Sequence, residues 1–129
     1  MILLDTHVLV WVNAEAQRVS AAARRAITEA RREGGVAVAA MTLFEVATMF
    51  VRGRLQPVGT VEQAVIALIE GTTVLPVTPA VAAIAAGFPR EFPGDPGDRL
   101  IAATAIAHGL ALVTADAAIR QSRQVRTIW

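Results

Sequence analysis

The sequence has 129 residues, of which 54% are hydrophobic, and 12 arginines against 11 acidic residues give it a formal net charge of +1. This length fits a single domain, residues 1–129, with one core, and so small a charge exerts no strong long-range attraction on nucleic acid. Cysteine and lysine are both absent, which excludes disulfides, thiolate metal sites and the lysine-dependent P-loop of nucleotide-binding proteins.

The apolar start of the chain does not resemble a secretory leader, because Asp5 and His7 interrupt it and no basic residue precedes it. An uncharged run, residues 71–89, has the length of a membrane span. It contains Pro76 and Pro79, however, and these favour a strand, a turn and a short helix. We therefore expect a soluble, cytoplasmic protein with no membrane partner.

The first elements in chain order are a strand and two helices. Residues 1–4 form a short apolar run without alternation, which is typical of a strand buried on both faces. Residues 7–12 continue as an apolar helix. Ser20 is a favourable N-cap for a helix over residues 21–32, and Gly34 ends that helix.

A second strand and two further helices follow. Residues 36–39 form another buried strand. Thr42 can cap a helix over residues 43–52, and Glu45 then stands at its third position, as in a capping box. A helix over residues 61–69 comes next.

The third strand is predicted over residues 74–77, and a proline-started helix over residues 79–86 follows it. Residues 88–97 are rich in proline and glycine, so they are predicted to form a loop. Asp98 then caps a helix over residues 99–108.

The chain ends with a fourth strand over residues 110–113, a short helix capped by Asp116 and a small edge strand over residues 125–128. Strands and helices thus alternate throughout the sequence. This alternation predicts an α/β fold in which helices cover a parallel sheet.

Four acidic residues occupy informative places in this order of elements. Asp5 and Asp116 each follow a strand, and Glu45 lies in the first turn of the helix after the second strand. Ligand sites of parallel sheets lie at the carboxyl ends of the strands, so these three residues fall at one edge. Asp98 joins them if residues 88–97 bring its helix to that edge. Helix capping is the alternative explanation for each residue taken singly.

Converging carboxylates repel one another, and a divalent cation offsets this repulsion. Mg²⁺ and Mn²⁺ prefer oxygen ligands, so either ion suits such a cluster. The acidic residues therefore predict a site for a divalent metal, with Mg²⁺ as the expected cofactor and Mn²⁺ as a substitute.

Three segments of the chain carry a resemblance to a known family. They are ILLDTHVLVW, TLFEVA and DPGDRLIAATAIAHGLALVTAD. They resemble the PIN domain family, and more narrowly the VapC-type toxins of toxin–antitoxin pairs. The family implies a three-layer α/β fold with a parallel sheet of about five strands flanked by helices. It also implies a metal-dependent endoribonuclease that hydrolyses RNA by in-line attack of water with a 3′-hydroxyl leaving group. Its implied partners are RNA, a cognate antitoxin and a second copy in a homodimer.

The resemblance assigns a place in the family's site to several residues. Asp5, Glu45, Asp98 and Asp116 match the four acidic metal ligands, of which Asp5 and Asp98 are the best candidates for direct contact. The resemblance also implies supporting positions at Thr6, Thr114 and Asp95. Arg99 is next to the site in sequence and is a weaker candidate for contact with substrate phosphate, the alternative being a solvated arginine in the first turn of a helix.

Other functions fit this sequence less well. A haloacid-dehalogenase-like phosphatase needs a second aspartate two residues after the first, and His7, which we expect to be a packing residue, stands there. A response-regulator receiver needs a lysine, which this chain lacks. The remaining alternative is a catalytically silent PIN-like module that binds RNA or protein, and metal-dependent cleavage of RNA separates it from the enzyme.

Overall fold

Strand β1 (Ile2–Leu4) lies at the centre of a five-stranded parallel sheet in the computed structural model, which describes residues 1–129. The strand order is β3-β2-β1-β4-β5, and every neighbouring pair is parallel. The other strands are β2 (Val36–Ala39), β3 (Thr72–Leu75), β4 (Leu112–Val113) and β5 (Thr127–Ile128). The predicted parallel sheet of about five strands is confirmed, and so is the edge position of the last strand.

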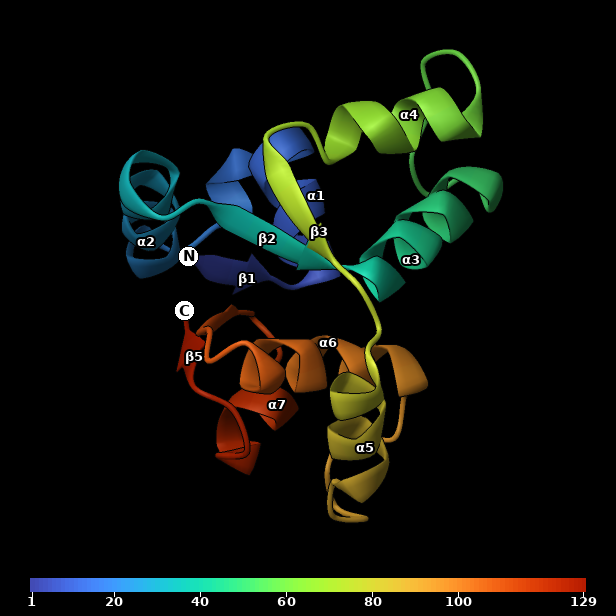
Figure 1. Cartoon of the computed structure of the whole chain (residues 1–129). Coiled ribbons are helices and arrows are strands. Elements are labelled where there is room, and N and C mark those ends of the chain that lie inside the picture. Colours follow the sequence, from blue (N-terminus) through green and yellow to red (C-terminus); the bar gives the residue numbers. More distant parts are fainter.

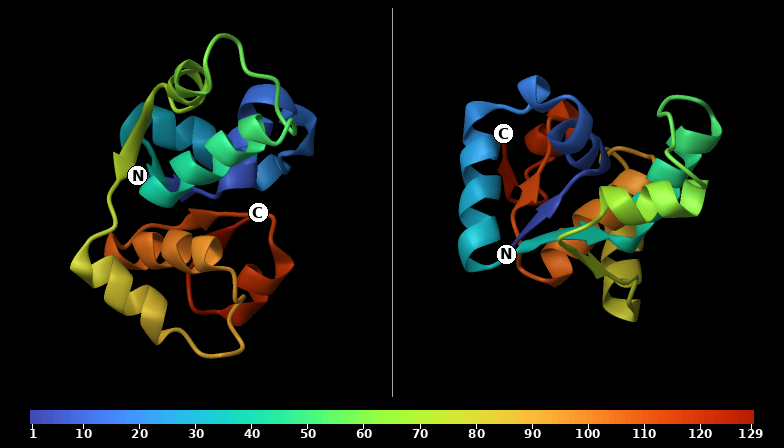
Figure 2. Two further views of the ribbon diagram at one scale, coloured as in Figure 1. Left: turned by 90° about the vertical axis from the view of Figure 1, so that its right-hand side faces the viewer. Right: turned by 90° about the horizontal axis from the view of Figure 1, so that it is seen from above.

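Helices cover both faces of the sheet, giving the three layers visible in Figures 1 and 2. One layer comprises α1 (Thr6–Ala14), α2 (Ala21–Glu33), α3 (Ala40–Val51) and α4 (Val61–Leu68), with a 3₁₀ turn at Ala16–Arg18. The opposite layer comprises α5 (Pro79–Gly87), α6 (Pro96–Ala107) and α7 (Ala117–Ser122). None of these helices is both long and apolar enough to cross a membrane.

Alternation along the strands divides the core into two clusters. Successive side chains of a strand point to opposite faces, so Leu3 packs toward α6 whereas Leu4 packs toward α1 and α2. Leu112 and Val113 are divided in the same way. Both faces are therefore buried, which explains why these strands appear in the sequence as unbroken apolar runs.

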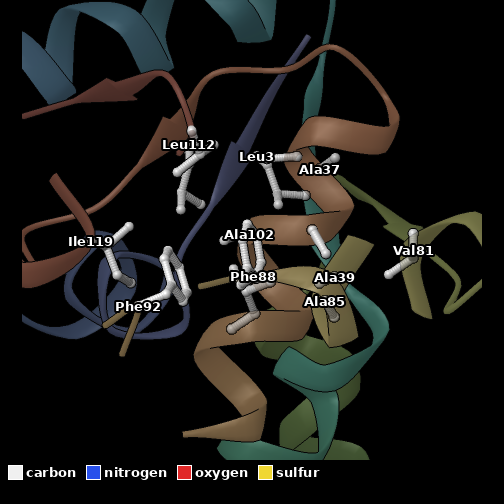
Figure 3. Packing of buried hydrophobic residues seen from close by; sticks show 14 residues of the cluster. Leu3, Ala37, Ala39, Val81, Ala85, Phe88, Phe92, Ala102, Leu112 and Ile119 are labelled. Atoms are coloured by element: carbon white, nitrogen blue, oxygen red, sulfur yellow. The ribbon is translucent and has the colours of Figure 1, made fainter. Parts of the chain in front are cut away.

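Helix α6 packs against the sheet through small side chains. Residues 101–105 are all buried, and Ala102 lies near Leu3 and Leu112 in Figure 3. The rings of Phe88 and Phe92 stack beneath them with centroids 4.2 Å apart. The alanines of this helix thus serve the core of their own chain and leave little apolar surface there for a second copy.

Two helix starts differ from the prediction. Helix α3 begins at Ala40, directly after β2, and its N-cap Ala39 provides no side-chain hydrogen bond. Thr42 and Glu45 therefore lie inside the helix, and the predicted capping box is wrong. Helix α6 begins at Pro96 with Asp95 as its N-cap, because proline suits the first helical position. The predicted capping role of Asp98 is therefore also wrong.

Candidate functional site

The order of the strands creates a crevice at the carboxyl ends of β1 and β4. The chain proceeds outward from β1 through β2 to β3 and then returns to place β4 on the other side of β1. Ligand sites of open parallel sheets lie at such a reversal of strand order. Asp5 follows β1 at this point, and Thr114 and Asp116 follow β4.

Asp5 is held in one orientation by two hydrogen bonds. The Thr6 amide donates to Oδ1 at 2.8 Å, and the Thr114 hydroxyl donates to Oδ2 at 2.7 Å. The residue is 7% exposed. Each carboxylate oxygen has a further lone pair that these bonds leave available, so Asp5 can still bind a cation at the mouth of the crevice.

Thr6 connects this residue to Glu45 on α3. The Thr6 hydroxyl donates to Glu45 Oε1 at 2.7 Å and lies 3.1 Å from the hydroxyl oxygen of Thr42. A hydroxyl has one proton, so the Thr42 hydroxyl donates to Thr6 when Thr6 donates to Glu45. Glu45 is thereby turned toward Asp5 even though it lies on another element.

Thr114 joins Asp5 to Asp116 on the other side of the crevice. While its hydroxyl donates to Asp5, the same oxygen accepts a hydrogen bond from the Asp116 amide at 3.1 Å. Asp116 caps α7 by accepting from the Ile119 amide at 3.0 Å, as the sequence predicted. Only one carboxylate oxygen is used in the cap, so capping and metal binding are compatible at this residue.

The first turn of α6 completes the acidic cluster. Asp95 Oδ1 accepts from the Gly97 amide at 2.7 Å. A Cβ atom placed on Gly97 would lie 3.0 Å from Glu45 Oε2 and 3.0 Å from Asp95 Oδ1. Glycine at this position therefore allows α3 and α6 to approach each other. Asp98, the third residue of the helix, is half-buried and has no hydrogen-bond partner among those that the structure contains.

Burial and mutual repulsion make this cluster electrostatically unfavourable. Burial raises the pKa of Asp98 to about 7, and the charges of neighbouring carboxylates add to the shift. These carboxylates are Asp5, Asp95, Asp116 and Glu45. Burial also raises the pKa of Asp5 and of Glu45, against the opposing effect of the hydrogen bonds from Thr114 and Thr6. Five acidic side chains, from the end of β1, from α3, from the start of α6 and from the start of α7, thus come to one place.

The side chains at this place fit a divalent cation by their chemistry. All are oxygen donors, and none is neutralised by an arginine, since the chain's one ion pair joins Arg18 to Glu15 elsewhere. No group of three or more acidic or histidine side chains is arranged to hold an ion by direct contact alone. Mg²⁺ commonly keeps several of its waters and binds one or two carboxylates together with substrate phosphates, so such a preformed cage is not required.

Arg99 has a different role from the one predicted. Its guanidinium donates to the backbone carbonyls of Phe88, Pro89, Phe92 and Pro93 over 3.2–3.5 Å, and it lies 5.9 Å from the Phe92 ring centroid. These bonds occupy its nitrogens, so the prediction that Arg99 binds substrate phosphate is not supported. The residue instead fastens the loop before α6 and so helps to place the first turn that carries Asp95 and Asp98.

Three contributions to the site could not be recognised from the sequence. Thr42 was interpreted as a cap, whereas it belongs to the hydrogen-bonded chain that orients Glu45. Gly97 lies between the two aspartates of the DPGD segment. Only this place in the sequence indicates that Gly97 lies close to Glu45. His7, expected to be a packing residue, is exposed; its ring centroid lies 6.0 Å from that of Trp11, and it acts to lower the pKa of Asp5 and of Glu45.

Comparison with known proteins agrees with this arrangement. The family described as PIN domain matches residues 2–123. Ribonuclease VapC22 of Mycobacterium tuberculosis (strain ATCC 25618 / H37Rv) is 45% identical over 130 residues, which cover 99% of this chain and 98% of the relative.

Solved structures share the fold over nearly the whole length. VapBC2 from Rickettsia felis, bound to a DNA fragment from its promoter, superposes with a TM-score of 0.75 at 15% identity, over 98% of this chain and 97% of the other. FitAcB from Neisseria gonorrhoeae gives a TM-score of 0.62 at 26% identity, over 98% and 96%. With its three layers, its acidic crevice and a family match over almost every residue, the chain belongs to the PIN domain family.

Proposed function

We propose that this chain is a metal-dependent endoribonuclease and the toxin of a toxin–antitoxin pair. The observation that carries the proposal is the convergence of four carboxylates at the carboxyl edge of the sheet with no arginine paired to them. These residues are Asp5, Glu45, Asp98 and Asp116. The 45% identity to a protein named a ribonuclease supports the choice of RNA as substrate.

Each residue has a distinct task in this proposal. Asp5 and Asp98 are the direct metal ligands, because Asp5 is fixed by two donors and Asp98 has no other partner. Glu45 and Asp116 bind through water or hold a second ion. Thr6 and Thr114 orient the carboxylates, and Asp95 holds the first turn of α6.

A phosphodiester is negatively charged, so the bare carboxylates would repel it. When bound, Mg²⁺ or Mn²⁺ reverses this local charge, activates water and stabilises the charge that develops on the phosphate oxygens. The contribution of the protein is geometric, since the crevice keeps the carboxylates in place before substrate arrives.

Removal of the metal provides the direct test. The purified chain should cleave single-stranded RNA in Mg²⁺ or Mn²⁺, lose cleavage in EDTA and regain it when metal is restored, because carboxylates alone cannot bind the phosphate. Fragments are resolved on a denaturing gel from one preparation. RNA that is bound but stays intact in both metals would favour the catalytically silent module and contradict the proposed activity.

The toxin assignment makes a separate prediction in cells. Expression of the chain alone in a bacterial cytoplasm should arrest growth, and co-expression of the cognate antitoxin should restore it, because an unrestrained ribonuclease destroys cellular RNA. The Asp98→Asn variant, expressed to the same soluble level, is the matched control and should be harmless. Normal growth with soluble, folded wild-type protein would remove the toxin assignment while leaving the nuclease assignment intact.

Exposed apolar side chains on the outer helices support a protein partner. Val51, Val58 and Ile66 are 73%, 90% and 60% exposed on or between α3 and α4, and apolar surface gathered in this way is typical of interfaces. We assign this surface to the antitoxin. The homodimer stays a prediction from the sequence, and the alanines of α6, which lie in the core, provide little surface for it.

A further inference from the structure

A groove continues from the acidic cluster along α3 and has a volume of about 410 Å³. Glu45 and Asp95 line one end of it, and Arg52 and Arg54 line it where the helix ends. Glu45 and Arg52 are seven residues apart, so they lie on one face of the helix about 10 Å from each other along its axis. The groove therefore connects negative groups at the site to positive groups beyond it.

The two arginines of this groove have no partner within the chain. Both are exposed, and neither takes part in a side-chain hydrogen bond or in the chain's one ion pair. Arg99 differs from them, because its guanidinium donates hydrogen bonds to backbone carbonyls. Two free guanidinium groups beside a phosphodiesterase site are suited to the phosphates next to the one that is cut.

An aromatic side chain lies in the same groove. Phe44 precedes Glu45 in α3 and is 67% exposed. His7, which is also exposed, lines the same groove. Exposed aromatic rings in charged grooves are typical of proteins that stack the bases of single-stranded nucleic acid.

We infer that this groove holds the single-stranded RNA that flanks the scissile bond, with Arg52 and Arg54 on backbone phosphates and Phe44 stacked on a base. The inference rests on the proposed ribonuclease function and names how its substrate is held. The charge pattern favours RNA as occupant, since the metal end and the arginine end would both attract phosphates. A groove lined by carboxylates alone would repel phosphates.

The test measures binding of a fluorescein-labelled, single-stranded RNA of mixed sequence by anisotropy in Mg²⁺ across a salt series. All proteins carry Asp98→Asn so that the probe stays intact. The groove variants are Arg52→Gln/Arg54→Gln and Phe44→Ala. The arginine control is Arg25→Gln/Arg32→Gln, which removes two exposed charges from α2, on the far side from α3 (Figures 1 and 2). The aromatic control is Ile66→Ala, which truncates a residue of similar exposure.

The double arginine variant should weaken binding roughly tenfold or more near 0.1 M salt. It should also reduce the slope of log K against log salt by about 1.4, that is, about 0.7 for each lost phosphate contact on a single strand. Phe44→Ala should weaken binding about tenfold without changing the slope, and Phe44→Trp should restore it, because stacking needs a ring but no charge. Both controls should bind like their parent.

The outcomes separate this inference from the proposed function. If wild-type protein cuts RNA but the double arginine variant keeps the affinity and slope of its parent, the groove inference is overturned and the nuclease assignment stands. If the parent does not bind RNA although wild-type protein cuts it, the groove inference is overturned and the nuclease assignment stands. If wild-type protein does not cut RNA either, both proposals fail. Melting curves of every variant verify that the comparison is between folded proteins.

Discussion

Replacing Asp5 or Asp98 by asparagine is expected to reduce metal-dependent RNA cleavage by about a hundredfold or more while the chain stays folded. Asparagine keeps the size of the side chain and an oxygen that can accept the Thr6 amide at position 5. It loses the charge on which a hard cation depends. Cleavage rates and melting temperatures of the same samples, with and without Mg²⁺, provide the measurement, and Glu70→Gln, an exposed carboxylate before β3, is the control.

The capping explanation makes the opposite prediction for these variants. If the aspartates only stabilised helix ends, the variants would melt earlier and retain wild-type cleavage per folded molecule, and this result would refute the proposed mechanism. The structure makes Asp98→Asn the more decisive of the two. Asp98 occupies the third position of α6 and caps nothing, whereas Asp5 does accept a hydrogen bond from the first residue of α1. Since asparagine is nearly as good a cap as aspartate, neither variant should lose much stability.

The sequence predicted the sheet because its three central strands, β1, β2 and β4, are buried on both faces. Leu3 and Leu4 enter different core clusters, and so do Ala37 and Val38, so the strands appear as unbroken apolar runs. Asp5 and Asp116 follow the ends of two of these apolar runs. Their place at the carboxyl edge of the sheet could therefore be predicted, since a residue that follows a central parallel strand lies at that edge. Local signals were sufficient here because each residue was placed by the element next to it.

Residues placed by distant elements were predicted less well. The interaction of Glu45 with Thr6 spans 39 positions in the chain, and the approach of Gly97 to Glu45 depends on how α3 and α6 pack. No local sequence pattern indicates such contacts, and the local pattern around Glu45 predicts a capping box instead. The contacts of Arg99 could not be predicted for the same reason. Its guanidinium donates to carbonyls of a proline-rich loop, and such a loop has no periodic sequence pattern.

The raised pKa values in the acidic cluster predict that the metal-free protein loses stability as pH rises. Burial raises the pKa of Asp98 to about 7 in the folded chain, from 3.8, and burial also raises the pKa of Asp5 and Glu45. At pH values between 3.8 and about 7, the folded state binds more protons than the unfolded state. The free energy of unfolding must therefore fall with increasing pH from about 4 to 7. In EDTA, we expect a lower melting temperature at pH 8 than at pH 5.

Mg²⁺ should reverse this loss, because a cation that binds only the folded state stabilises it and competes with protons for the same oxygens. The melting temperature should thus rise with Mg²⁺ at pH 8 and much less at pH 5. Asp98→Asn is the matched variant: in EDTA it should exceed wild type in melting temperature by more at pH 8 than at pH 5, and it should gain less from Mg²⁺. A wild-type melting temperature that is equal or higher at pH 8 in EDTA, with no gain from Mg²⁺, would show that the carboxylates neither repel one another nor bind the ion.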